Sequence, residues 1–230
     1  MRSHPIVAID GPAGSGKSST AREVSRRLRY AYVDSGAVYR ACALVALDTL
    51  GAAENWTAEA VVGAARAADI AVRAESGDFA VTAGGRSVEP AIRSARVTEQ
   101  SSRVATMGPV RDFVNRLLRA AAVDGAVVMD GRDIGTVVFP DAEVKIFMVA
   151  HPEERARRRL AEKGEAVDRR SLEAEAGVLQ ERDARDSRRD VAPLQMAAGA
   201  TVIDTSAMSF EDQVALVVDL ARKVGRRDSA

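Results

Sequence analysis

The sequence predicts an α/β protein with a parallel sheet at its core and a small antiparallel insert. Two observations favour the sheet: short apolar runs alternate with longer segments of helical spacing, and the runs are continuously apolar, as in strands buried on both faces. A glycine-punctuated stretch at 70–88 predicts the insert. The 230 residues, 47% of them hydrophobic, suit one folded unit of ordinary size, 1–230.

The chain opens with a strand, a turn and a helix. The apolar run IVAID at 6–10 is too short for a helix and predicts a strand. A turn rich in glycine and proline follows, and residues 17–28 have helix-compatible spacing. The pattern repeats as a strand at 31–34 and a helix at 37–50.

The insert and two helices come next. Turns at 76–78 and 84–85 separate three short strands, and we place the antiparallel insert at about 66–92. Helical spacing returns over 92–122 but breaks at 107–109, where a proline should end one helix and open the next at its first turn.

Three strands and a final helix complete the predicted core. We expect the strands at 126–130, 144–149 and 201–204, and the last helix carries apolar residues at helical spacing: Val214, Leu216, Val217 and Leu220. The polar stretch 162–168 joins two arginine-rich helices and predicts a short lid at about 158–170.

Charge and cysteine content exclude several functions. Basic and acidic residues number 33 each, so no overall positive field is available to hold nucleic acid or an anionic membrane. No window reaches the roughly 18 apolar residues of a membrane helix, and we expect a cytoplasmic protein. The single cysteine, Cys42, excludes an intrachain disulfide, and its apolar neighbours favour a buried side chain over a catalytic thiol.

The strongest motif is a phosphate-binding loop. Residues 11–18, GPAGSGKS, match G-x-x-x-x-G-K-S/T between a predicted strand and a predicted helix, as the motif requires. Its glycines let backbone N–H groups point at phosphate oxygens, and Lys17 reaches the β- and γ-phosphates. Ser18 is expected to ligate Mg²⁺. A plain glycine-rich turn would not explain lysine and serine at these positions in a chain with four lysines.

The loop predicts a nucleoside triphosphate site but leaves the reaction open. No N-K-x-D run for guanine is present, which disfavours a GTPase. A motor or transporter ATPase normally needs more chain for coupling, whereas a small-molecule kinase suits this length. A P-loop ATPase or a nucleotide-dependent regulatory module remains the alternative from a different class.

Two later segments carry a more specific resemblance: GRDIGTVVFPDA at 131–142, and ERDARDSRR at 181–189 followed by APL at 192–194. With the phosphate loop, Ile92-Arg93 and DSGAVYR at 34–40, they make the chain resemble a bacterial cytidylate kinase over about residues 6–224. The resemblance implies a P-loop kinase core with the insert in its nucleoside-monophosphate-binding part. It also implies transfer of the γ-phosphoryl group of ATP to CMP or dCMP. Another nucleoside monophosphate kinase, for UMP or AMP, is the nearest alternative.

The resemblance also assigns the site residues, in four groups. Arg40, Arg132 and Arg189 are expected to bind the acceptor phosphate. Together with Lys17 they are the expected catalytic residues. The sugar and its surroundings fall to Ser35, Arg182 and Asp186, and cytosine falls to Ser102, Arg111 and Asp133. ATP falls to the loop and to lid arginines: Gly11, Pro12, Ala13, Gly14, Ser15, Gly16, Lys17, Ser18, Ser19, Arg155, Arg158 and Arg159.

Structural alternatives exist for the charged helix faces. Arg182, Asp186 and Arg189 lie at i, i+4 and i+7, so on a helix they share one face, and they can equally form a solvated ion-pair ladder. Arg188 competes with Arg189 for the phosphate. The arginines at 155–159 can instead make an exposed basic helix surface.

Three further assignments have alternatives. Asp130 ends a buried strand and is expected to hold Mg²⁺ through water, as acidic strand-end residues do in this class, unless it caps the next loop. Asp133 can instead pair with Arg132 or cap the following turn. Ser101 competes with Ser102 for the base.

The implied reaction needs cations rather than a base. The second pKa of the acceptor phosphate is about 6, so it is already a dianion at neutral pH. Guanidinium groups bind such oxygens in fixed geometry and stabilise the transferring group. Closure of insert and lid should exclude water. We expect Mg²⁺ with ATP as cofactor, and a monomeric enzyme.

Overall fold

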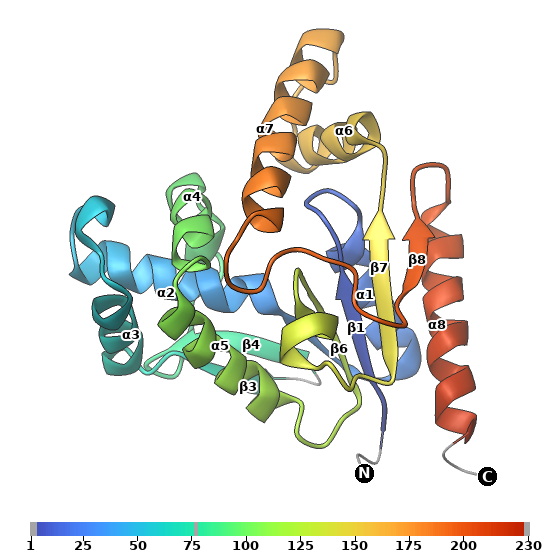
Figure 1. Cartoon of the computed structure of the whole chain (residues 1–230), viewed down its shortest axis with the longest axis horizontal. Coiled ribbons are helices and arrows are strands. Elements are labelled where there is room, and N and C mark those ends of the chain that lie inside the picture. Colours follow the sequence, from blue (N-terminus) through green and yellow to red (C-terminus); the bar gives the residue numbers. More distant parts are fainter. Residues whose placement is uncertain (1–3, 76–77, 228–230) are drawn as a thin grey trace. The chain divides into compact units, whose positions relative to one another are not determined.

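The computed structural model describes residues 4–75 and 78–227. Its contacts divide the chain into two compact units, one of Met1–Tyr30 with Gly125–Ala230 and one of Ala31–Asp124. The first unit holds the parallel strands β1 (Ile6–Asp10), β6 (Val127–Gly131), β7 (Val144–Val149) and β8 (Thr201–Asp204) (Figure 1). The second unit holds the antiparallel strands β3 (Ala71–Glu75), β4 (Asp78–Ala83) and β5 (Arg86–Ser87).

The first unit is built on parallel strands. β1 (Ile6–Asp10) lies between β6 (Val127–Gly131) and β7 (Val144–Val149), and β8 (Thr201–Asp204) pairs with β7. Every residue of β1 and β6 is buried, which requires cover on both faces because side chains alternate between them. β1 and β6 are parallel, and their last residues, Asp10 and Gly131, lie side by side. The loops that follow the two strands therefore begin at the same edge of the sheet.

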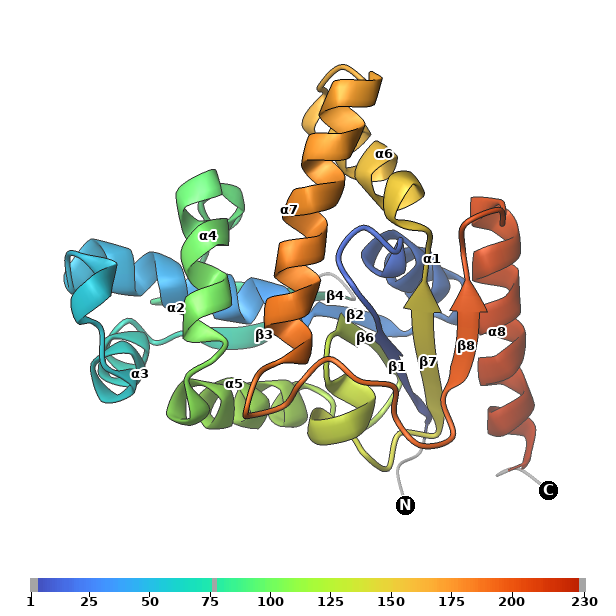
Figure 2. The same cartoon turned by 45° about the horizontal axis from the view of Figure 1, so that its top comes forward.

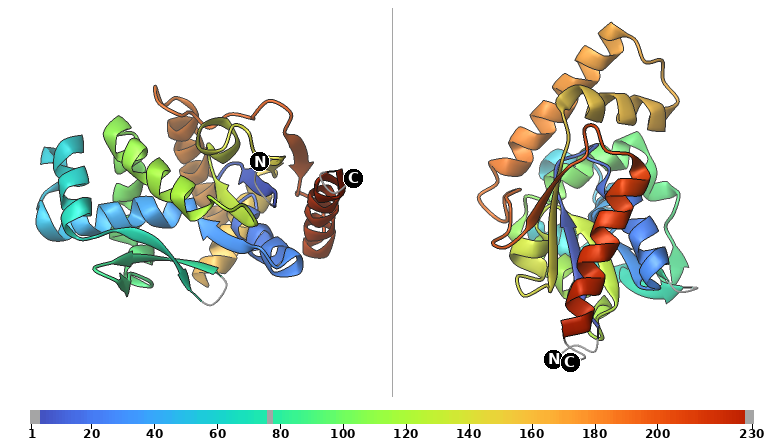
Figure 3. Two further views of the ribbon diagram at one scale, coloured as in Figure 1. Left: turned by 90° about the horizontal axis from the view of Figure 1, so that it is seen from below. Right: turned by 90° about the vertical axis from the view of Figure 1, so that its right-hand side faces the viewer.

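Two helices cover these strands. α1 (Lys17–Leu28) follows the loop after β1 and packs against β6 and against α8 (Phe210–Arg227). Figure 3 shows α8 running alongside β7 and β8. A single π-helical turn, η3 (Ile134–Val138), follows β6 and contacts β1.

Two further helices follow the carboxyl end of β7 and pack against each other (Figure 2). α6 (Pro152–Lys163) ends at Gly164, whose backbone is left-handed. α7 (Arg169–Ser187) begins at Asp168, which accepts a hydrogen bond from Ser171 N while Ser171 Oγ accepts one from Asp168 N. These two end signals fix the short connection at 164–168.

The second unit combines helices with the antiparallel sheet. In the sheet, β4 lies between β3 and β5, and α5 packs against β3. Its elements in order are β2 (Ala31–Asp34), α2 (Ser35–Thr49), η1 (Ala53–Asn55), α3 (Ala58–Ala67), β3 (Ala71–Glu75), β4 (Asp78–Ala83), β5 (Arg86–Ser87), η2 (Ala91–Arg93), α4 (Ala95–Val104) and α5 (Gly108–Ala121).

The predicted fold class is confirmed, with differences in detail. α2 begins at Ser35, two residues early, because Asp34 accepts a hydrogen bond from Ala37 N and so caps the helix. α3 and η3 were not expected. Ser76 and Gly77 of one predicted turn lie outside the described residues. Cys42 is buried as expected, and burial raises the pKa of its thiol to about 12.

Among the described residues, no helix combines the length and the apolar character needed to cross a membrane. The proposed division into kinase unit, insert and lid stays a prediction.

Candidate active site

The phosphate loop joins β1 to α1, and its glycines are required by shape. Gly11 has φ +151°, and a Cβ there would lie 2.2 Å from Met148 O on β7. Gly14 has φ +74°, and its Cβ would lie 2.9 Å from Arg155 O. The loop therefore packs directly against β7 and α6, where no side chain fits.

Lys17 is the first residue of α1 and is buried beneath this loop. Its ammonium donates to Pro12 O over 2.9 Å. Burial, followed by the positive charge of Arg132, lowers the pKa of Lys17 to about 7, while Asp130 opposes this. A lysine held among other cations is suited to receive a polyanion, because phosphate oxygens would remove the repulsion.

Ser18 and Asp130 form an oxygen pair beside Lys17. Ser18 Oγ donates to Asp130 Oδ2 over 2.6 Å, and Asp130 is buried at the end of β6. Hydroxyl and carboxylate oxygens are the donors that Mg²⁺ prefers, and Mg²⁺ usually takes its remaining ligands from water and phosphates. Among the described residues, no group of three Asp, Glu, His or Cys side chains is placed to hold a metal ion. The pair fits a magnesium ion that arrives with ATP.

Asp186 gathers the arginines expected at the acceptor phosphate. Its Oδ2 accepts from Arg132 Nε over 2.9 Å, and its Oδ1 accepts from Arg189 Nη2. Although burial opposes ionisation, the charges of Arg132 and Arg189 lower the pKa of Asp186. Arg182 contributes to this field and to that of Lys17, so four cations converge here. The solvated ladder is ruled out, because Asp186 is buried and pairs with a residue 54 positions away.

Asp133 lies in the loop after β6, and the side chain of Asp10, the last residue of β1, reaches the turn that follows it. Asp133 is buried, and its side chain makes no capping hydrogen bond to η3, so the predicted capping alternative is absent. Capping is done by Asp10, whose two carboxylate oxygens accept from Ile134 N at 2.8 Å and Gly135 N at 2.7 Å. Burial raises the pKa of Asp10 to about 6, against these two hydrogen bonds.

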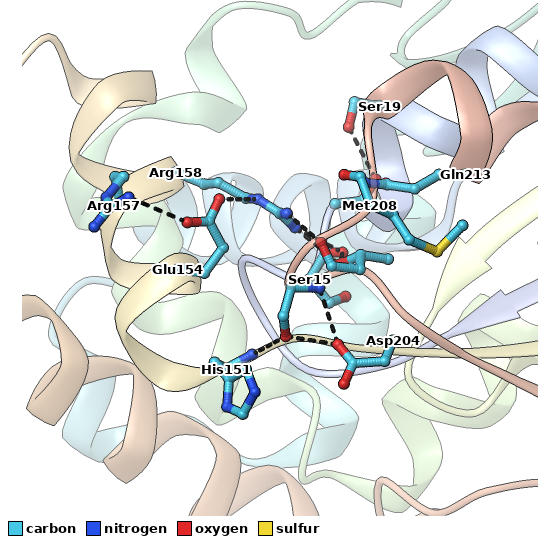
Figure 4. A network of polar contacts seen from close by, with 12 residues as sticks. Ser15, Ser19, His151, Glu154, Arg157, Arg158, Asp204, Met208 and Gln213 are labelled. Atoms are coloured by element: carbon cyan, nitrogen blue, oxygen red, sulfur yellow. Dashed lines mark hydrogen bonds and ion pairs between the residues drawn. The ribbon is translucent and has the colours of Figure 1, made fainter.

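The arginines of α6 have different surroundings. Arg155 is buried, and Arg158 is part of a polar network with Ser15 and Glu154 (Figure 4). Arg159 is more exposed and pairs with Glu162 at 2.8 Å within its own helix. The exposed basic surface therefore describes Arg159 better than the other two.

In the second unit, Asp34 gathers two arginines at the start of α2. Arg40 Nη2 lies 2.7 Å and Arg93 Nη1 3.0 Å from Asp34 Oδ2. Burial opposes ionisation of Asp34, but the charges of Arg40 and Arg93 lower its pKa. Ser35, the first residue of α2, is also buried here. Arg40 is thus held in place by a carboxylate, as Arg132 is in the first unit.

The predicted cytosine contacts of this unit lie on α4 and α5. Ser101 Oγ donates to Thr98 O in its own helix over 2.7 Å, which leaves Ser102 as the better candidate of the two serines. Arg111 is buried, donates to Ala105 O over 2.9 Å and stacks over the Tyr39 ring at 5.3 Å from its centroid. Its guanidinium plane is therefore fixed.

Sequence reasoning missed the residues that hold the predicted ones. Asp10 ends a buried strand just before a loop, and Asp34 ends a strand just before the helix that it caps, and both positions were usable signals. Tyr39, which lies against Arg111, gave none. Neither did Asp183, 2.6 Å from Arg155 Nη2, nor Thr205, whose Oγ1 accepts from Arg158 Nη1 over 2.9 Å, because these contacts join chain segments that meet only in the fold.

These features define the class of protein. A phosphate loop on a parallel sheet, a Ser–Asp oxygen pair beside its lysine, and arginines held by carboxylates together make a P-loop kinase.

Comparison with known proteins gives the particular family. A sequence model of the cytidylate kinase family matches residues 7–223. The chain is 45% identical over 219 residues to the cytidylate kinase of Salinibacter ruber, covering 93% of this chain and 95% of that one. It is 44% identical over 231 residues to the cytidylate kinase of Pelotomaculum thermopropionicum, covering 99% and 100%. The chain belongs to the cytidylate kinase family.

Solved structures add a likeness of fold. An uncharacterized protein from Eubacterium ventriosum matches with a TM-score of 0.51 at 10% identity, covering 95% of this chain and 99% of that one. At such low identity the match supports the fold alone.

Proposed function

We propose that this protein transfers the γ-phosphoryl group of ATP to CMP, and to dCMP, giving ADP and the corresponding diphosphate. Membership of the cytidylate kinase family supports the reaction. The observation that carries it is the convergence of Lys17 with Arg132, Arg182 and Arg189, because two polyanions must be brought together for the transfer.

The chain's residues bind and orient rather than exchange protons. Loop residues 11–19 take the triphosphate, and Lys17 stabilises charge on the transferring group. Arg40, Arg132 and Arg189 take the acceptor phosphate, with Asp34 and Asp186 setting the planes of these guanidinium groups. The acceptor is already a dianion near neutral pH, so attack needs no general base.

Mg²⁺ arriving with ATP would be held by Ser18 directly and by Asp130 through water, and it would neutralise charge between the β- and γ-phosphates.

Base selection is assigned to Ser102, Arg111 and Asp133, and the sugar to Ser35, Arg182 and Asp186. A carboxylate accepts from the amino group of cytosine but repels the carbonyl of uracil. An arginine donates to the acceptors of cytosine but meets an N–H in uracil. Both contacts favour the same base.

Of the lid arginines, Arg159 remains a predicted ATP contact, and Arg155 and Arg158 are expected to act on ATP through the phosphate loop, whose carbonyls they bind. A cytoplasmic location and a monomeric state are also predictions; sedimentation velocity tests the second.

An acceptor panel tests the proposal. ADP formation is measured with CMP, dCMP, UMP, AMP and no acceptor at equal concentrations. We expect the highest kcat/KM with CMP or dCMP, and little ADP without an acceptor. A preference for UMP or AMP would make this another monophosphate kinase, and undiminished ADP formation without any acceptor would make it an ATPase.

A further inference from the structure

Two arginines of α6 donate hydrogen bonds to backbone carbonyls of the phosphate loop. Arg155 Nε donates to Ala13 O over 2.6 Å, and Arg158 Nη1 donates to Ser15 O over 3.4 Å. The two arginines lie three residues apart, so they share a face of the helix. Alternate carbonyls of the loop are therefore held from the side of α6.

Each guanidinium is itself anchored by a second element. Arg155 Nη2 lies 2.6 Å from Asp183 Oδ2 on α7. Arg158 Nη1 donates to Thr205 Oγ1 over 2.9 Å, and its Nη2 donates to Thr205 O over 2.7 Å. Its remaining Nε donates to Glu154 over 3.0 Å (Figure 4). All three nitrogens of the Arg158 guanidinium group therefore donate hydrogen bonds to protein oxygens.

Thr205 also touches the loop itself. It is fully buried between β8 and α8, and its Oγ1 lies 3.0 Å from Ser15 O and 3.1 Å from Val149 O. A buried hydroxyl in this position cannot contact a nucleotide, so any effect it has on ATP must pass through Ser15 or Arg158.

Because the peptide group is planar, holding a loop carbonyl in place also fixes the direction of the N–H group of the next residue. In a trans peptide, the carbonyl of one residue and the N–H of the next point in opposite directions. A carbonyl of Ala13 held toward α6 turns the Gly14 N–H away from α6, and Ser15 does the same for Gly16. Gly14 and Gly16 have φ of +74° and +88°, and glycine allows many other conformations. The loop therefore needs outside contacts to hold this one.

We propose that Arg155 and Arg158 are positioning residues that aim the Gly14 and Gly16 amides at the ATP phosphates, supported by Asp183 and Thr205. The inference rests on the proposed ATP site and deepens it. Amides already oriented bind phosphate without an ordering cost, and their dipoles stabilise charge best when fixed in advance.

Thr205→Val tests the proposal, because it removes the hydroxyl and keeps the side-chain shape. ATP and inorganic tripolyphosphate are titrated into the full chain without CMP. We expect the dissociation constants of both to rise by about tenfold, the size expected for one lost hydrogen bond in a charged network. Equal losses for the two ligands place the effect at the phosphates and not at the base.

A double-mutant cycle separates positioning from direct contact. Arg158→Met and Arg158→Met with Thr205→Val should bind ATP equally weakly, since both break one chain of contacts. Arg157→Met is the control, because Arg157 is an exposed arginine on the same helix, and its ion pairs are with exposed Glu153 and half-buried Glu154 of that helix rather than with the loop. If Thr205→Val binds like the wild type while Arg158→Met does not, Arg158 contacts ATP itself and the proposal is overturned.

If Thr205→Val does not fold, Asp183→Asn provides a second test of the proposal. It weakens the other anchor and should also lower affinity for tripolyphosphate; wild-type affinity in a folded Asp183→Asn protein would overturn the role of Arg155. Failure of the wild type to bind either ligand would instead contradict the proposed function.

Discussion

Lys17 is the residue at which burial and charge most change the chemistry of a side chain. Burial, then the charge of Arg132, lowers its pKa to about 7, and the phosphates of ATP would raise it again. At pH 8 the free protein therefore holds Lys17 mostly neutral, and binding should take up about one proton per ATP. Below pH 6 the amine is already charged and the uptake should vanish.

Calorimetric titration at pH 8 in buffers of different ionisation heat measures this uptake. Lys17→Arg is the control, because a guanidinium stays charged and takes up no proton. The same binding enthalpy for the wild type in every buffer would show that Lys17 is charged before ATP arrives.

Arg132 should need its planar fork as well as its charge. Its Nε is engaged by Asp186, which fixes the plane in which the group meets the acceptor phosphate. Arg132→Lys keeps the charge but loses the fork, so kcat/KM for CMP should fall by about tenfold or more. Steady-state kinetics decide, and unchanged kcat/KM would remove the bidentate contact.

Asp133 should set the preference for cytosine. In Asp133→Ala, kcat/KM should fall far more for CMP than for UMP, reducing their ratio by about 10- to 100-fold, the value of one base-edge contact pair. Asp10→Asn serves as a comparison, since it disturbs the same loop through its backbone. Equal losses for CMP and UMP in Asp133→Ala would make Asp133 structural.

The charged residues of the candidate site could be picked out from the sequence more easily than the residues that hold those charged side chains in place. Lys17, Asp130 and Arg132 lie in motifs whose spacing is local, so the sequence alone singles them out, and their roles stay predictions. The pairing of Arg155 with Asp183, and of Arg158 with Thr205, joins segments 28 and 47 residues apart in the chain. No local pattern specifies such pairs, because they depend on how α6 packs against α7 and near the end of β8.

At the scale of elements, β1 and the loop after it are fixed by contact with β7. A Cβ on Gly11 would lie 2.2 Å from the backbone of Met148, which cannot move without breaking the sheet. Gly11→Ala should therefore lower the free energy of unfolding by about 3 kcal/mol or more.

Gly164→Ala is the matched control for Gly11→Ala. Gly164 also has a positive φ, +69°, but has open space around its Cβ position, so its substitution should cost about 1 kcal/mol. Urea unfolding of both variants gives the comparison. Equal losses would show that backbone conformation, and not the approach of β7, requires glycine at 11.

Strands and helices with strong periodicity were predicted well, and others were missed for physical reasons. β1, α1, β2 and β7 have the predicted bounds because continuous apolar runs or clear end signals mark them. α3 (Ala58–Ala67) is rich in alanine and has Val61 and Val62 as its only large apolar residues, so few side chains mark its buried face. η3 contains β-branched residues that favour a strand, and Asp10 overrides this by binding its first two amides.

At the scale of the whole molecule, composition and fold are compatible with several kinds of phosphotransferase. Membership of the cytidylate kinase family selects one of them. Balanced charge fits a small-molecule kinase, since the chain carries no excess of positive charge to hold nucleic acid and any anion site must be local. The fold likeness at 10% identity says nothing about the acceptor, whereas 44–45% identity over nearly the whole chain concerns cytidylate kinases.

The central claim is that the phosphoryl group leaving ATP ends on CMP. Phosphorus NMR of the protein with Mg²⁺, ATP and CMP follows ADP and CDP together. We predict that CDP and ADP appear in equal amounts, with no inorganic phosphate. Inorganic phosphate formed in step with ADP, with CMP left unchanged, would contradict the claim.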